Sequence, residues 1–252
     1  TDAAGESMSK LRSGTRVTVT VQALSSVRTL RNVIAETPGG DPGNVVMAGA
    51  HLDSVIDGPG INDDGSGVAT LMGIGEELAT GKPKNKVRFA FWAGEEYGLL
   101  GSRHYVDGLT DDERGGIAVY LNFDMLASPN YAPLVYDDTG APHGSADVTR
   151  LLLDLLKEEG VQGERIDLAG RSDHYAFEQA GIPVGGLFSG AEEIKSDEEA
   201  RRYGGEANEP FDACYHQACD DISNISNEAL ADLSKVAAAA VAAFANGAAP
   251  GS

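Results

Sequence analysis

The sequence predicts an α/β fold whose central sheet is mixed but mostly parallel and is sandwiched between helices. Three observations lead to this fold class. Residues 44–50 and 86–93 are apolar runs, typical of strands buried on both faces. Segments with helical spacing of apolar residues alternate with such runs along the chain. The 252 residues contain no internal repeat or low-complexity linker, so we expect a single catalytic domain spanning residues 1–252.

The individual elements follow from periodicity and from turn residues. Strict alternation predicts a first strand at residues 16–21, and a second is expected at 29–36, before a Gly/Pro-rich turn at 38–43. The other predicted strands cover 44–50, 86–93, 117–122 and 182–188, with a short one at 135–136. The predicted helices cover 65–78, 97–106, 146–159, 172–179 and about 227–245. Ser172 is the expected N-cap of the fourth helix, and Ser226 or Asn227 that of the last.

Charge and cysteine content restrict the possible partners. The formal net charge of −20 argues against nucleic acids and anionic membranes as partners. No apolar run reaches the ~18 residues that a membrane span needs. Cys214 and Cys219 form a close pair, which in an exported protein suggests a small-loop disulfide; a buried reduced pair is the alternative. Residues 1–6 lack the pattern of a signal peptide, so we expect a chain that is processed or truncated at its start.

Several candidate functional residues lie where predicted strands end. His51 follows a buried strand, and Asp53 could hold its second imidazole nitrogen through its carboxylate. Asp63 lies in a Gly-rich stretch that reads either as a simple turn or as a loop placing its carboxylate between two cations. Glu95 and Glu96 are adjacent carboxylates after an apolar strand, where one could bind metal while the other moves a proton.

Two further segments add to this set. Asp124, between Phe123 and Met125, needs a partner if it is buried. A disulfide around residues 215–218 would hold Tyr215 and His216 in a small rigid loop; a Cys/His zinc site using both cysteines is the rival, but it lacks a fourth ligand at the usual spacing. Two histidines and three or four carboxylates suit a pair of Zn²⁺ ions, with one histidine on each ion and one aspartate bridging.

The order of these segments resembles the M28 family of metallopeptidases, and most closely its secreted Streptomyces-type double-zinc aminopeptidases. The resemblance runs from about residue 32 to about residue 224. It is carried by the runs GAHLDSV, GPGINDDGSG, AGEEYGLLGS, LNFDM, GRSDH and CYHQACD. The resemblance implies the zinc-dependent exopeptidase fold and two Zn²⁺ ions per chain. It also implies a cis peptide bond between Asp63 and Asp64.

The resemblance further implies roles for individual residues. The implied metal ligands are His51, Asp63, Glu96, Asp124 and His216. Asp63 would bridge the ions, with Asp124 joining His51 and Glu96 joining His216. Glu95 would be the general base and Tyr215 would stabilise the oxyanion. Arg171 would lie near the amino end of the substrate, whose free amine Glu95 and Asp124 would recognise.

The implied activity is removal of single residues, preferably apolar ones, from the N-termini of peptides or proteins. The alternatives are a single-zinc enzyme like glutaminyl cyclases and a non-catalytic binding module. We expect a secreted monomer. Residues 1–14 look like the tail of a protease-associated domain that would precede this one. His174 is expected either to support the site or to begin a helix, and Met125 and Phe188 to line the core or the side-chain pocket.

Overall fold

The computed structural model describes residues 2–22, 26–247 and 250–251 and has a seven-stranded central sheet in the order β1-β3-β2-β4-β7-β5-β6. The strands are β1 (Val33–Glu36), β2 (Asp41–His51), β3 (Asn85–Trp92), β4 (Ile117–Phe123), β5 (Leu134–Tyr136), β6 (Glu164–Ile166) and β7 (Val184–Phe188). The four central strands β3, β2, β4 and β7 run parallel to one another, whereas β1 pairs antiparallel with β3 and β5 pairs antiparallel with β7; β6 is parallel to β5. The predicted mixed, mostly parallel sheet is therefore confirmed.

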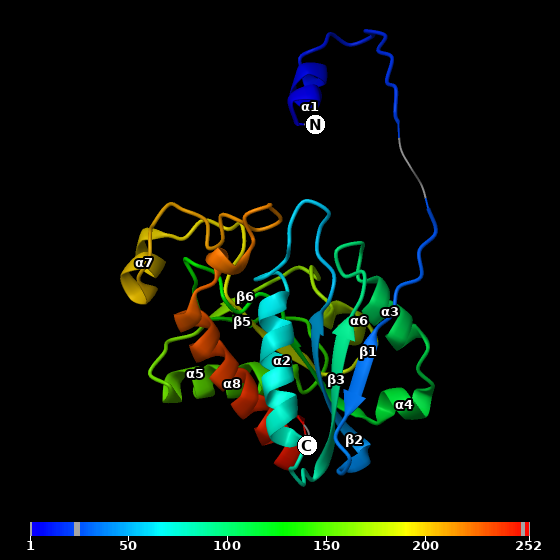
Figure 1. Cartoon of the computed structure of the whole chain (residues 1–252), viewed down its shortest axis with the longest axis vertical. Helices are drawn as coiled ribbons and strands as arrows, with labels where there is room; N and C mark the ends of the chain where they lie inside the picture. Colours follow the sequence, from blue (N-terminus) through cyan, green and yellow to red (C-terminus); the bar gives the residue numbers. More distant parts are fainter. Residues whose placement is uncertain (1, 23–25, 248–249, 252) are drawn as a thin grey trace.

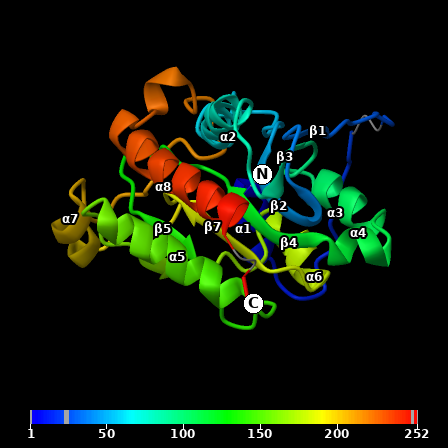
Figure 2. The same ribbon diagram turned by 90° about the horizontal axis from the view of Figure 1, so that it is seen from below.

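Helices cover both faces of this sheet (Figures 1 and 2). On one face lie α2 (Gly65–Leu78), α5 (Ser145–Glu158) and α8 (Asn227–Asn246), and on the other α3 (Leu100–Asp107), α4 (Asp111–Gly115) and α6 (His174–Gln179). The remaining helices are α1 (Asp2–Ser9), α7 (Asp197–Tyr203) and a 3-10 turn (Ile222–Asn224). Among the described residues, no helix is both long and apolar enough to cross a membrane.

Each face of the sheet has its own apolar core. Leu71, Leu152 and Val241, from α2, α5 and α8, pack on one face and are fully buried. On the other face, the ring of Phe177 from α6 stacks on Tyr120 of β4, with centroids 3.8 Å apart. Strands buried on both faces explain why the central strands read as continuous apolar runs.

The predicted strand at residues 16–21 is wrong. The segment forms no strand, and Val17, Val19 and Val21 are 50%, 67% and 77% exposed. The N-terminal residues extend away from the body of the molecule (Figure 1). Alternation favours a strand only where another strand supplies hydrogen bonds, and the described residues contain none beside this segment. The second predicted strand shortens to β1, and the short elements β6, α4 and α7 were not predicted.

Helix boundaries were predicted more closely. Helix α2 has the predicted bounds, and the side chain of Ser226 caps α8 by accepting a hydrogen bond from the Ala229 N–H. Ser172, however, is not the N-cap of α6. Asp173 occupies that position, and the Ser172 hydroxyl donates to the carboxylate of Asp124 instead. The Ser172 side chain therefore bonds a residue of the candidate site rather than the first N–H groups of the helix.

Candidate active site

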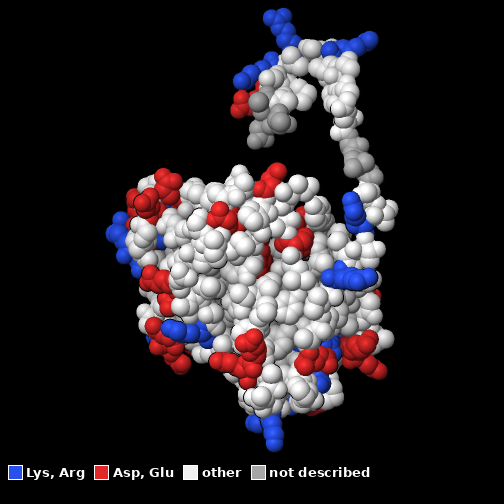
Figure 3. Space-filling model, in the orientation of Figure 1, with Lys and Arg blue, Asp and Glu red and all other residues white. Residues whose placement is uncertain are grey.

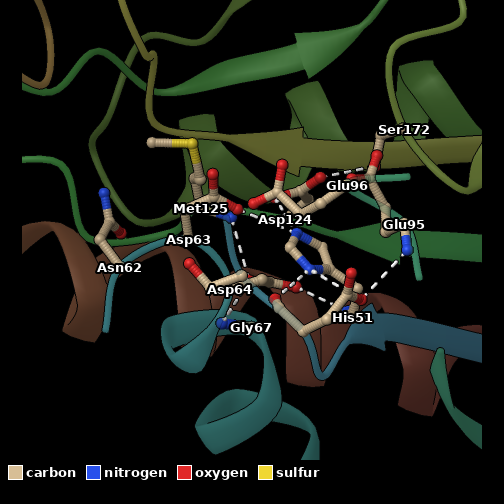
Figure 4. Close-up of polar contacts among 12 residues, drawn as sticks. His51, Asn62, Asp63, Asp64, Gly67, Glu95, Glu96, Asp124, Met125 and Ser172 are labelled. Carbon is tan, nitrogen blue, oxygen red and sulfur yellow. Dashed lines mark hydrogen bonds and ion pairs between the residues drawn. The ribbon is translucent and has the colours of Figure 1, made fainter. Parts of the chain in front are cut away.

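The candidate site lies at the carboxyl edge of the parallel strands. His51 is the last residue of β2, Asp124 directly follows β4, and Glu95 and Glu96 lie shortly after β3. Ligands of open α/β sheets gather at this edge, because the loops that leave neighbouring parallel strands converge there. The fold thus brings these four side chains together, although His51 and Asp124 are 73 positions apart in the sequence (Figure 4).

Asp63 enters the site from the loop before α2. The peptide bond between Asp63 and Asp64 is cis, as the resemblance implied. Asp64 caps α2 by accepting from the Gly67 N–H. At Gly67 a Cβ would lie 2.0 Å from the Phe123 carbonyl oxygen, so only glycine lets α2 approach the end of β4 this closely. This close contact sets Asp63 beside the residues that follow β4.

The carboxylate of Asp63 lies between two imidazoles. Its Oδ1 is 2.9 Å from Nε2 of His51, and its Oδ2 is 3.2 Å from Nε2 of His216. Each imidazole has a second carboxylate beside it: Asp124 Oδ1 lies 3.4 Å from His51 Nε2, and Glu96 Oε2 lies 3.0 Å from His216 Nε2. The structure therefore brings all five predicted metal ligands into two groups that share Asp63.

The electrostatics of this cluster are those of crowded, buried acids. Burial, reinforced by the charge of Asp124, raises the pKa of Glu95 to about 10. Burial and the charge of Asp63 likewise raise the pKa of Glu96 to about 7. Burial also acts to raise the pKa of Asp63, but hydrogen bonds from the two imidazoles outweigh it and lower that pKa to about 2. Cations would relieve the repulsion among these carboxylates.

The donor set fits metal ions. The ligand atoms of Asp63, Glu96 and His216 lie within 4.8 Å of one another. The Oε1 atom of Glu96 is buried and has no hydrogen-bond partner among the described residues, as expected of an oxygen that serves an ion. Imidazole nitrogen with carboxylate oxygen is a donor combination that suits Zn²⁺.

Asp64 also has a carboxylate oxygen close to the side chains of His51 and Asp124, within 4.8 Å of the atoms that could bind a metal. Both Asp64 oxygens, however, accept hydrogen bonds from backbone N–H groups. Its Oδ2 accepts from the backbone N–H of His51 (3.0 Å). Its Oδ1 accepts from the N–H groups of Gly67 (3.0 Å) and Met125 (3.1 Å). Three backbone donors satisfy this carboxylate, so Asp64 holds the chain around the site, and Asp63 is the better candidate for the shared ligand.

Asp53 supports the site differently from the prediction. The Nδ1 of His51 lies 2.9 Å from the backbone carbonyl of Asp53, whereas the Asp53 carboxylate is 3.9 Å away, beyond hydrogen-bond range. The carboxylate instead accepts from the N–H groups of Gly94 (2.7 Å) and Glu95 (3.0 Å). The predicted carboxylate–imidazole bond is thus wrong in its atoms, and Asp53 links the His51 strand end to the Glu95 loop.

The loop with Tyr215 and His216 closes the site from the other side. Cys214 and Cys219 form the predicted disulfide across it. The Tyr215 ring stacks on the His216 ring, with centroids 3.8 Å apart, and Arg171 donates a hydrogen bond of 3.4 Å to the Tyr215 hydroxyl. Arg171 is also paired with Glu192 at 2.7 Å. Burial raises the pKa of Tyr215, so its hydroxyl keeps its proton at neutral pH.

A cleft opens over these groups and has one apolar side. Its lining includes the predicted metal ligands, Glu95, Tyr215 and Arg171. The apolar lining residues are Met125, Leu168, Phe188 and Ala191. Met125 and Phe188 therefore line the cleft as well as the core beneath it. His174 is buried at the start of α6 outside this lining, and its Nδ1 has no partner among the described residues.

Sequence reasoning missed residues that hold the site together. Ser172 donates to Asp124 Oδ2 at 2.6 Å and accepts from Asn122, which in turn bonds Tyr120 and Tyr136. These polar side chains are buried, so their hydrogen bonds fix the orientation of Asp124. The signal was present but weak: Asn122 lies two residues before Asp124 in the LNFDM run, and Ser172 lies between two charged residues in the GRSDH run.

Comparisons with known proteins agree with this geometry. The model of peptidase family M28 matches residues 32–241. An aminopeptidase of Pseudomonas aeruginosa is 50% identical over 205 residues, covering 79% of this chain and 38% of its own length. A probable leucine aminopeptidase 2 of Aspergillus oryzae is 47% identical over 250 residues, covering 96% of this chain and 50% of its own. The chain therefore spans half or less of the length of these relatives.

Solved structures give the same result. The zinc aminopeptidase BSAP from Bacillus subtilis superposes with a TM-score of 0.68 at 28% identity, covering 83% of this chain and 49% of that one. The aminopeptidase from Aneurinibacillus sp. strain AM-1 gives a TM-score of 0.68 at 27% identity, covering 86% and 48%. With the family model matching most of its length, the chain belongs to peptidase family M28.

Proposed function

We propose that this chain is the catalytic part of a two-zinc aminopeptidase that removes single residues from peptide N-termini. One observation carries the proposal: the Asp63 carboxylate lies between the Nε2 atoms of His51 and His216, and each imidazole has a further carboxylate of its own. The names of the relatives, aminopeptidase and leucine aminopeptidase, support the activity. The choice of metal is supported by BSAP, a structural neighbour that is a zinc aminopeptidase.

His51 and Asp124 would hold one ion and His216 and Glu96 the other, with Asp63 shared between them. When bound, the ions supply Lewis acidity, which polarises the scissile carbonyl and makes water acidic enough to act as a nucleophile near neutral pH. The positive charge would also offset the repulsion by Asp124, which adds to the effect of burial in raising the pKa of Glu95 to about 10. Glu95 can then act as a base.

Glu95 would take a proton from the attacking water and pass it to the leaving amine. Its backbone is held for this by Asp53, through the 3.0 Å bond to the Glu95 N–H. Tyr215 would donate a hydrogen bond from its hydroxyl to the substrate carbonyl oxygen, on which negative charge develops. Its position is set by stacking on His216 and by the bond from Arg171.

Substrate selection would combine charge and apolar contact. The carboxylates of Glu95 and Asp124 would bind the free α-amine, which favours cleavage at the N-terminus over cleavage within a chain. The apolar side of the cleft, with Met125, Leu168 and Phe188, would receive an apolar first side chain. Acidic side chains outnumber basic ones in the chain, and Figure 3 shows the acidic side chains on one face of the molecule. The resulting negative charge favours cationic amines over anionic ligands.

Secretion is part of the proposal and is supported by the Cys214–Cys219 disulfide, since disulfides persist in oxidising compartments. We also propose that the chain acts as a monomer. The origin of residues 1–14 from a preceding protease-associated domain stays a prediction.

The test is zinc content per chain, paired with hydrolysis of a leucine anilide before and after chelation. We expect two zinc ions, with activity lost on chelation and restored by zinc. One zinc without amide hydrolysis would support a glutaminyl cyclase-like enzyme instead. No bound metal and no hydrolysis would support a binding module.

A further inference from the structure

One buried carboxylate outside the ligand set contacts the loop that carries Asp63. Asp220 is 2% exposed, and its Oδ1 accepts from the Asn62 N–H at 2.9 Å while its Oδ2 accepts from the Asp63 N–H at 3.1 Å. Its backbone carbonyl accepts from the Ile61 N–H at 3.1 Å. Three consecutive N–H groups of the loop therefore bind a single residue that lies 157 positions from Asp63.

This arrangement determines where the Asp63 side chain points. Charge-assisted bonds to two neighbouring N–H groups hold the peptide planes on either side of Asn62 in one orientation. Asp63 has a short side chain, so its carboxylate direction follows from the position of its backbone. Small rotations would move one Asp63 oxygen away from its imidazole, because the two oxygens face opposite imidazoles at 2.9 and 3.2 Å.

Asp220 is connected to His216 as well. It follows Cys219 directly, so it begins where the disulfide loop ends, and its N–H donates to the Gln217 carbonyl at 3.1 Å. His216 has a positive φ of 58°, a conformation that a non-glycine residue keeps only when its surroundings impose it. Asp220 thus contacts the loop of one proposed ligand and terminates the loop of another.

The amide of Asn224 holds Asp220, and a second carboxylate holds that amide. The Asn224 amide donates to Asp220 Oδ1 at 3.3 Å and to the two oxygens of Asp212 at 2.9 and 3.0 Å. Asp212 also accepts from the Asn62 side chain at 2.7 Å and from the Cys214 N–H at 2.8 Å. The bonds among Asn62, Asp212, Asp220 and Asn224 form a closed network of four buried residues, which favours one arrangement of both loops.

We propose that Asp220 is a positioning residue: its carboxylate fixes the backbone at Asn62 and Asp63 and so sets the spacing between Asp63 and His216. This inference rests on the proposed two-metal site. Its consequence is that zinc affinity depends on a residue that touches neither ion, as is found for outer partners of metal ligands.

The test is Asp220→Asn in the whole chain, with Zn²⁺ affinities measured by competition with a chelator and Co²⁺ absorption spectra recorded for each site. The amide group cannot accept from a backbone N–H, so one of the two loop bonds is lost. We expect at least one zinc dissociation constant to rise about 10–100-fold, with altered Co²⁺ bands. Unchanged constants and bands in a folded Asp220→Asn variant would overturn the proposal.

The chain offers two controls. Asp221→Asn makes the same change one residue on, where the carboxylate caps only the short 3-10 turn through Ser223. Val241→Ala loosens the buried core of α8 without touching either loop. Both should leave the zinc constants unchanged, and a rise in Val241→Ala equal to that in Asp220→Asn would overturn the proposal, because lost stability would then explain both.

If the Asp220→Asn variant does not fold, the zinc dissociation constants of an Asn224→Ala variant test the proposal instead. This substitution removes the bonds from the Asn224 amide to Asp220 and Asp212 and keeps both bonds from Asp220 to the loop of Asp63. A smaller rise in the same direction supports the proposal, and unchanged constants overturn it. Failure of the proposed function looks different. In that case the wild-type chain binds no zinc pair, whereas failure of this inference alone leaves two zinc ions bound with equal affinity in the wild type and in Asp220→Asn.

Discussion

Replacing Glu95 by Gln separates proton transfer from metal binding. The substitution keeps the size and shape of the side chain and removes only its capacity to accept a proton at neutral pH. The backbone stays in place, because the bond from the Glu95 N–H to Asp53 does not involve the changed group. None of the five proposed metal ligands is altered, so we expect two zinc ions to remain bound.

The size of the effect follows from the role and the surroundings of the residue. A positioned general base contributes about 10²–10⁴-fold to a rate, which corresponds to about 2.7–5.4 kcal/mol of activation barrier. Glu95 is suited to this role because burial and Asp124 raise its pKa to about 10, and nearby cations would lower that pKa enough to leave the carboxylate ionised and able to accept a proton. Proton transfer belongs to the transition state, so we expect most of the loss in kcat. A smaller rise in KM should accompany it, because Glu95 shares the binding of the α-amine with Asp124, which keeps its charge.

The assay is steady-state hydrolysis of a leucine anilide together with zinc content per chain. Glu158→Gln, an exposed position at the end of α5, is the matched control and should behave as wild type. A kcat for Glu95→Gln within about tenfold of wild type, with both ions bound, would refute the assignment of the base. Loss of an ion would instead show that Glu95 is a ligand.

Three further predictions concern stability and specificity. Burial lowers the pKa of His174 from 6.5 to about 4, so the unfolded chain binds the proton more tightly; stability should fall as pH drops from about 6.5 to about 4, by about 3 kcal/mol in total. Urea unfolding at several pH values measures this loss of stability. The loss should be absent in the His174→Phe variant, and a variant with the same pH profile as the wild type would contradict the reasoning. Replacing both Cys214 and Cys219 by Ser opens a short loop and should lower the free energy of unfolding by about 2 kcal/mol through chain entropy, as measured by urea unfolding. The double variant should also bind zinc more weakly. Zinc affinity equal to that of the wild type would mean that the Asp220 network alone holds the loop. Leu168→Asp places a charge on the apolar side of the cleft and should lower kcat/KM for a leucine anilide relative to a lysine anilide by about tenfold; an unchanged ratio would place the side-chain pocket elsewhere.

Much of the fold could be predicted because its signals are local. The apolar runs of β2, β3 and β4 mark strands buried on both faces, and the cap residue Ser226 marks the start of α8. The strand predicted at residues 16–21 failed, because alternation describes a segment whereas pairing requires a neighbouring strand. The short elements β6, α4 and α7 were missed, because each is too short to show a period.

The candidate site divides in the same way. His51, Glu95 and Asp124 were identified because each is a charged or polar residue at or shortly after the end of an apolar strand, where burial without a partner is costly. The hydrogen bonds that hold these residues in place could not be predicted. Asp53 bonds N–H groups 41 and 42 positions away, and Ser172 bonds Asp124 over 48 positions. A hydroxyl or carboxylate can serve as a cap, a turn or a partner, and its own neighbourhood in the sequence does not distinguish these uses.

The sequence by itself determined the α/β class, the central strands, the close cysteine pair and the residue types of the site, and its motifs pointed to the family. All of these depend on side-chain chemistry and short-range periodicity, which a linear chain displays directly. Only the tertiary structure decided that the Asp53 carboxylate bonds the loop of Glu95 rather than the imidazole of His51, and that Asp220 holds the loop that carries Asp63. Those outcomes depend on hydrogen bonds between distant segments, whose geometry exists only once the strands and helices have packed.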